Sequence, residues 1–185
     1  MKKLLLIVPF VALLSSCEKD DPVIPNEEEV ITTLIYTLTP DSGAGDTVEL
    51  KFYDADGDGG IAPVLTSSGP IKANTVYNGA LRLLNEIEDP AEETTDEIRE
   101  ESEDHQFFFK FDGLDATAVA VDADDNGNPI GLSSKFTAGA ASSGQLTITL
   151  RHQPDKFGQG VSDGEIANAG GETDIEVTFD VVIEE

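Results

Sequence analysis

The feature that most constrains the fold is a regular alternation of apolar and polar residues near the end of the chain. From Asp174 to Ile183, every second residue is apolar. Successive side chains of a β-strand point to opposite faces of a sheet, so this period of two predicts a strand with one buried face. The same alternation recurs in residues 48–53 and 146–151. The chain is therefore expected to consist of half-buried strands.

Further strand candidates are separated by turn-rich segments such as Asn126-Gly127. Residues 30–39 are apolar or β-branched on both faces, which predicts a central strand. The other candidates are residues 75–84, 106–111, 116–121 and 132–136. About eight short strands with scarcely any helix predict an antiparallel β-sandwich, immunoglobulin-like or similar, over residues 30–185.

One stretch departs from this alternation. Acidic residues dominate residues 86–104, in which Arg99 is the single base. Helix-start spacing predicts a short exposed helix from Thr95 to Glu103, with Ile98 as its apolar anchor. Like charges four residues apart destabilise such a helix. We therefore expect it to need cations or a basic partner.

The start of the chain has the composition of an export signal. Lys2 and Lys3 precede an apolar run from Leu4 to Leu14, which is too short to span a bilayer. The sequence Leu14-Ser15-Ser16-Cys17 resembles the bacterial lipobox, which implies removal of residues 1–16 and diacylation of Cys17. The alternative is that Cys17 is a small apolar residue near an ordinary cleavage site. A lipid-bearing Cys17 would anchor the protein to a membrane that it does not cross.

Residues 17–29 are expected to form the lipidated N-terminus and an acidic tether. Glu18-Lys19-Asp20-Asp21 resembles the surface-export signal of Bacteroidota lipoproteins, and an ordinary polar tether is the alternative. Pro22 and Pro25 favour an extended chain. We therefore expect a protein that is lipid-anchored in the outer membrane and faces the cell surface.

Charge and motifs exclude several functions. Asp and Glu number 37 against 11 Lys and Arg, a formal net charge of −26, which excludes nucleic-acid binding by charge alone. With Cys17 acylated there is no thiol nucleophile, and the sequence has no Gly-x-Ser-x-Gly elbow and no catalytic triad or zinc-protease motif. We expect a non-catalytic protein.

An aspartate-rich loop follows the strand at residues 48–53. Asp54, Asp56 and Asp58 alternate before a glycine, as in the first half of a calcium-binding loop. The twelfth position is Leu65 where an EF-hand has glutamate, so any Ca²⁺ ligands that complete this loop must come from elsewhere. The alternative is a plain Gly/Asp turn. Ca²⁺ is the one cofactor that these residues favour.

Asp122, Asp124 and Asn126 repeat the pattern before Gly127. Asn126-Gly127 is also a ready hairpin turn, so this loop is the weaker calcium candidate.

The chain has two histidines, His105 and His152, each at the end of a predicted strand. If those strand ends meet, the two imidazoles and a carboxylate predict a site for Zn²⁺ or Cu²⁺. The alternative is a pair of ordinary strand-end histidines, because nothing in the sequence brings them together.

Several segments together resemble a family of flavobacterial outer-membrane lipoproteins of about this length. They are Asp56-Gly57-Asp58-Gly59-Gly60, Leu84 to Pro90, Asp104-His105-Gln106-Phe107-Phe108, Leu150-Arg151-His152-Gln153-Pro154 and Ala169 to Ile175. Members are sometimes named for a type 1 periplasmic-binding fold, whereas the period of two here predicts a β-sandwich. The resemblance implies an outer-membrane setting beside TonB-dependent receptors and carries no established activity.

Two functions follow as expectations. The first is an accessory binding protein for nutrient or metal uptake, with the membrane and a TonB-dependent receptor as partners. The second is a structural or adhesive surface module without a small-molecule ligand.

Overall fold

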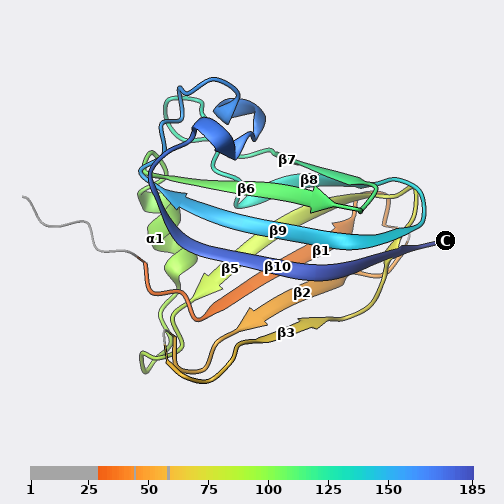
Figure 1. Ribbon diagram of the computed structural model, residues 1–185, viewed down its shortest axis with the longest axis horizontal. Coiled ribbons are helices and arrows are strands. Elements are labelled where there is room, and N and C mark those ends of the chain that lie inside the picture. The colour runs from red at the N-terminus through yellow and green to blue at the C-terminus, as the bar shows by residue number, and fades with distance from the viewer. Residues whose placement is uncertain (1–28, 44, 58) are drawn as a thin grey trace, which may run out of the picture.

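The computed structural model describes residues 29–43, 45–57 and 59–185, which form two packed β-sheets (Figure 1). The export signal, Cys17 and the tether before Glu29 lie outside the described residues, as does Asp58. The predicted all-β sandwich is confirmed.

The first sheet has six strands, and every neighbouring pair in it is antiparallel. In spatial order they are β3 (Val64–Ser67), β2 (Val48–Tyr53), β1 (Thr33–Pro40), β5 (Val76–Leu84), β8 (Ser133–Ala138) and β7 (Ala116–Ala120). β1 pairs on both of its edges, so the expectation of a central strand there is met.

The second sheet has four strands. In spatial order they are β4 (Ile71–Lys72), β10 (Glu172–Glu184), β9 (Ser142–His152) and β6 (His105–Asp112). β4 runs parallel to β10, and the other pairs are antiparallel. The core lies between the two sheets, where the apolar side chains that the alternation marked in β9 and β10 are buried.

One buried hydrogen bond joins two hydroxyl groups of the first sheet. The Tyr36 hydroxyl on β1 and the Ser134 hydroxyl on β8 are hydrogen-bonded at 2.7 Å, and they lie over Gly79 of β5. A Cβ atom at Gly79 would lie 2.5 Å from the Tyr36 hydroxyl oxygen. Gly79 is therefore required by close packing, and it allows a buried polar group to find its partner.

Helix α1 (Thr94–Glu100) lies at one end of the sandwich (Figure 1). It is shorter than the predicted helix, because the chain turns through residues 101–104 to enter β6. Ile98 is fully buried, as expected of the anchor. The Thr95 hydroxyl adds a second attachment, since it accepts from the Leu83 amide at 2.8 Å and lies 3.1 Å from the Leu83 carbonyl oxygen.

The connection from β9 to β10 carries two short 3₁₀ turns, η1 (Val161–Asp163) and η2 (Ile166–Asn168). It covers the outer face of β6, where Phe108 packs with Val161 and Ala169. The Gln106 side chain donates to the Val161 carbonyl at 2.8 Å. The first half of β6 is therefore buried on both faces.

Two strands were not predicted. β3 is exposed at all four of its positions, so it lacks the alternation that marks a half-buried strand. β4 has only two residues, too few for any period.

The anchoring role of Ile98 predicts the effect of its truncation. Ile98→Ala should lower the free energy of unfolding by about 2–5 kcal/mol, because it leaves a cavity under α1. The matched control is Ile87→Ala, at a side chain that is 54% exposed, and it should change stability little. Chemical denaturation of both variants tests this, and equal effects would contradict the anchor.

Candidate metal centre

Three buried side chains meet at the end of the second sheet that lies beside α1 (Figure 1). His105 begins β6 and His152 ends β9, and the strand register places these two residues directly opposite each other. Their rings are 4.7 Å apart between centroids, and the residues are 0% and 5% exposed. The strand ends on which the histidine prediction depended therefore do meet.

The carboxylate of this cluster is Asp174, and a β-bulge brings it in. Thr173 pairs with Arg151 and Ile175 pairs with Leu150, so Asp174 is the extra residue on β10. Its side chain is fully buried, and its Oδ1 lies 3.2 Å from His152 Nδ1. Plain alternation puts Asp174 on the outer face, opposite to Ile175. No residue of this segment marks a bulge, so sequence analysis could not find this ligand.

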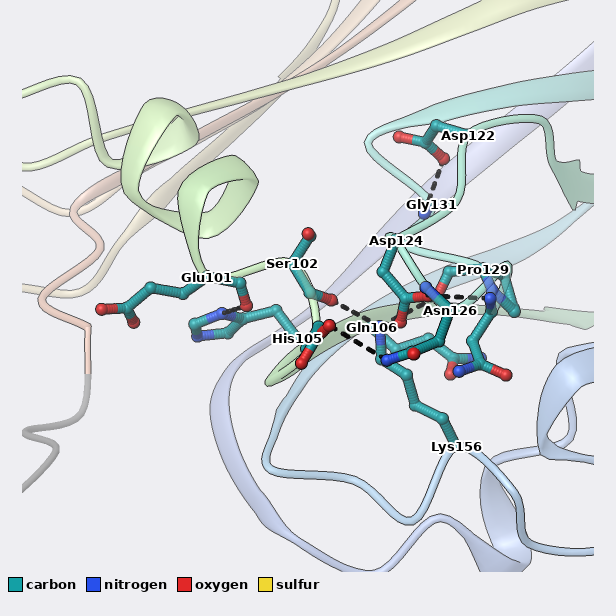
Figure 2. Close-up of polar contacts among 12 residues, drawn as sticks. Glu101, Ser102, His105, Gln106, Asp122, Asp124, Asn126, Pro129, Gly131 and Lys156 are labelled. Carbon is teal, nitrogen blue, oxygen red and sulfur yellow. Dashed lines mark hydrogen bonds and ion pairs between the residues drawn. The ribbon is translucent and has the colours of Figure 1, made fainter.

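The hydrogen bonding of His105 fixes its tautomer. Its Nδ1 lies 3.1 Å from the backbone carbonyl oxygen of Glu101 (Figure 2). A carbonyl oxygen only accepts, so Nδ1 carries the hydrogen. Burial lowers the pKa of His105, which favours the neutral ring. A neutral ring protonated at Nδ1 has its lone pair on Nε2.

That lone pair faces two carboxylates. His105 Nε2 lies 3.7 Å from Asp174 Oδ2 and 4.0 Å from Glu29 Oε1. Neither Nε2 nor Oδ2 has a hydrogen-bond partner among the described residues, although both atoms are buried. An unsatisfied buried polar group costs about 1–3 kcal/mol. Burial raises the pKa of Asp174, while the two histidines oppose that shift. The pair needs a proton or a cation between its members.

The surroundings of the cluster are acidic. Burial, together with the charge and hydrogen bond of Glu97 and the charges of Glu101 and Asp174, raises the pKa of Glu29 to about 7. All of these influences act in the same direction, because each disfavours another negative charge at this place.

The three side chains form a group that could hold a transition-metal ion after a small contraction. Two ligand atoms bonded at about 2.1 Å to one tetrahedral ion lie about 3.4 Å apart. The ligand atoms of His105, His152 and Asp174 all lie within 4.8 Å of one another, and His105 Nε2 lies 3.7 Å from Asp174 Oδ2. His152 Nδ1 and Asp174 Oδ1 are hydrogen-bonded at 3.2 Å, a bond that an ion bound to both atoms would replace. Donation of the second ring nitrogen to a backbone carbonyl, as His105 Nδ1 does to Glu101, is the usual support of a metal-bound histidine.

The loop of Asp122, Asp124 and Asn126 has other partners. The Asp122 carboxylate accepts from the amides of Gly131 and Ser133, at 2.8 and 2.9 Å. Asn126 points outward and donates to Glu103 at 3.0 Å. These contacts do not favour Ca²⁺ there, and calcium binding by this loop stays a prediction.

Asp124 pairs with a buried lysine that sequence analysis did not single out (Figure 2). Lys156 Nζ lies 3.0 Å from Asp124 Oδ2, and both side chains are at most 3% exposed. The ammonium also donates to the carbonyls of Ser102 and Pro129. Burial raises the pKa of Asp124, but the hydrogen bonds of Asn128 and Lys156 outweigh it and hold the pKa low. This lysine supplies the positive charge that a calcium ion would bring.

The structure defines fewer carboxylate contacts in the loop after β2. Asp54 Oδ1 accepts from the Asp56 amide and Asp56 Oδ2 from the Ile61 amide, both at 3.3 Å. Asp56 Oδ1 is buried without a partner among the described residues. Because Asp58 lies outside them, calcium binding by Asp54, Asp56 and Asp58 also stays a prediction.

The buried ion pair predicts a large asymmetry between two lysines. Lys156→Met should cost about 3–5 kcal/mol of stability, because Asp124 would keep a buried charge without its cation. Lys135→Met removes the exposed pair with Asp41 and should have little effect. Thermal and chemical unfolding of both variants measure this. Equal losses of stability in the two variants would show that the buried Lys156–Asp124 pair stabilises the fold no more than the exposed pair does.

The Glu29 environment predicts a pH dependence in metal-free protein. The folded-state pKa of about 7 lies above the ordinary value of 4.5, so the folded state holds more protons between these values. This group therefore destabilises the fold increasingly as pH rises from about 4.5 to about 7. With metal removed by a chelator, the melting temperature of Glu29→Gln should fall less steeply with rising pH over this range than that of the wild type. The control Glu100→Gln, at an exposed residue of α1, should show the wild-type dependence of melting temperature on pH. The same dependence in Glu29→Gln would contradict the prediction.

Among the described residues, no helix has the length and apolar character needed to cross a membrane. No family model, curated protein or solved structure matches this chain.

Proposed function

We propose that this protein is a lipid-anchored, non-catalytic binding protein of the outer membrane that takes one divalent transition-metal ion. One observation carries the metal part of the proposal. It is the buried pair of His105 Nε2 and Asp174 Oδ2, which face each other at 3.7 Å and have no hydrogen-bond partner in the part of the chain that the structure describes. His152 supplies the third ligand from the neighbouring strand.

The ligand types indicate which ions bind. Imidazole nitrogens suit Zn²⁺ and Cu²⁺, whereas Ca²⁺ takes six to eight oxygen ligands. Two imidazoles and a carboxylate therefore favour Zn²⁺ or Cu²⁺ over Ca²⁺.

Burial supports binding over catalysis. His105 is 0% exposed and the Asp174 side chain is 0% exposed, so an organic substrate has no direct access to the cluster from solvent. A catalytic zinc site keeps an open position for water or substrate, whereas a structural or storage site is enclosed by the protein.

The cellular role is inferred from the sequence. The lipobox-like segment that ends at Cys17 supports a lipid anchor, and the resemblance to flavobacterial lipoproteins supports a place beside a TonB-dependent receptor. In that setting, a metal site on an anchored domain would serve metal uptake.

The alternative is a structural or adhesive module, and a groove favours it. β6 and β7 are edge strands of the two sheets, and a groove of 480 Å³ is lined by residues of both. Phe109, Phe111 and Ala118 give it an apolar wall onto which an extended partner segment could add.

Metal titration tests the proposal. The purified full chain in detergent should bind one Zn²⁺ per molecule in calorimetry, and its melting temperature should rise with Zn²⁺. Asp174→Asn keeps the shape but loses the charge, and it should weaken binding at least tenfold. Asp56→Asn is the matched control and should bind as the wild type does.

Two results would overturn the metal part. One is the absence of saturable binding with Zn²⁺ and with Cu²⁺, which would leave the module alternative. The other is Zn²⁺ binding that Asp56→Asn abolishes and Asp174→Asn leaves unchanged, which would move the site to the loop after β2.

A further inference from the structure

Glu29 stands between the predicted tether and the metal centre. It is the last residue of that tether in the sequence and the first residue that the structure describes. Its side chain is only 14% exposed, which is unusual for a glutamate. Its Oε1 approaches His105 Nε2 to 4.0 Å, and Asp174 Oδ2 approaches the same nitrogen to 3.7 Å.

His105 belongs to two overlapping groups of ligand-type side chains. One group contains His152 and Asp174, and the other contains Glu29 and Glu101. The shared Nε2 is buried and has no hydrogen-bond partner among the described residues. An ion bound to this nitrogen would therefore lie within reach of ligands from the N-terminal segment as well as from the second sheet.

In the absence of a cation, the negative charges around Glu29 raise the free energy of its partly buried position. Its carboxyl group faces Glu97 and Glu101 of the helix end and Asp174 of β10, and all of these carry or compete for negative charge. Like charges held this close repel, and water does not screen them fully when they are partly buried. A divalent cation at Nε2 would turn the same arrangement from repulsive to attractive.

We propose that Glu29 is the fourth ligand of this metal ion, so that metal binding fastens the end of the tether to the sandwich. The inference rests on the proposed metal site. Two nitrogen and two oxygen ligands complete a tetrahedral, closed site. The Glu29 Oε1 to His105 Nε2 distance must shorten from 4.0 Å to about 3.4 Å, and the ion must replace the hydrogen bond of Glu29 with Glu97.

The consequence is control of how the domain sits on its anchor. β1 begins at Thr33, and the chain enters the sandwich from the end where α1 lies (Figure 1). With the ion bound, that end is tied to the tether through Glu29. Without the ion, Glu29 keeps its hydrogen bond with Glu97 but is repelled by the charges of Glu101 and Asp174, so its attachment is weaker.

The test compares Glu29→Gln with Glu100→Gln, an exposed position on α1 that removes the same charge. Calorimetry with Zn²⁺ on the full chain should show affinity lowered about 10- to 100-fold by Glu29→Gln and hardly altered by Glu100→Gln. Hydrogen exchange adds a positional readout. In the wild type, Zn²⁺ should slow exchange at residues 29–31 and at the β6, β9 and β10 ends together. In Glu29→Gln it should slow exchange at the strand ends alone.

The outcomes separate the two proposals. If Zn²⁺ binds and protects the strand ends, but residues 29–31 exchange as before, the tether inference is wrong and the metal site stands. The same holds if Glu29→Gln binds Zn²⁺ as tightly as the wild type. If Zn²⁺ neither binds nor slows exchange anywhere, both proposals fail. Wild-type circular dichroism spectra in both variants verify that the substitutions leave the fold intact.

Discussion

The inward face of β9 determines where the polar cluster lies. Leu146, Ile148 and Leu150 occupy every second position of that face, and the period places His152 next on it. On β6, Phe107 points into the same core, and His105 lies two positions before it. Side chains in a strand alternate strictly, so neither imidazole can turn to solvent without a register shift that would expose the apolar residues. The alternation that builds the sandwich therefore also holds the two rings together.

The protein buries two carboxylates and balances them differently. Asp124 receives the ammonium of Lys156 and backbone amides, so its countercharge is part of the chain. Asp174 is hydrogen-bonded to His152 Nδ1 and to the Glu29 backbone amide, but among the described residues its ion-pair contacts are with imidazoles alone. A buried carboxylate without a cation loses its charge or finds an external partner. The first site is therefore a permanent brace, and the second is the one that the proposed metal ion would neutralise.

The strands with alternating residues were predictable, and the departures have identifiable causes. β2 has the bounds that the sequence predicted, whereas β3 and β4 carry no usable period. The histidines of the site were predictable as candidates, because each extends a strand. Asp174 was not, since its inward direction comes from one bulge, and Lys156 was hidden in an irregular connection. Local pattern thus identifies the strands, while backbone irregularity selects the carboxylates that face inward.

A shared proton and a metal ion make different demands on the His105 and Asp174 pair. A hydrogen bond needs its heavy atoms within about 3.2 Å, and these atoms lie 3.7 Å apart. A proton on Nε2 would also make the buried His105 ring cationic, because Nδ1 already donates to the Glu101 carbonyl. A metal ion bonds the same lone pair and leaves that donation intact. Its binding free energy then appears as folding stability, about 2.7 kcal/mol at a hundredfold excess over the dissociation constant. In the proposed site that gain would fall where three strands, α1 and the chain entry meet, so metal binding would order the end of the domain that the tether joins.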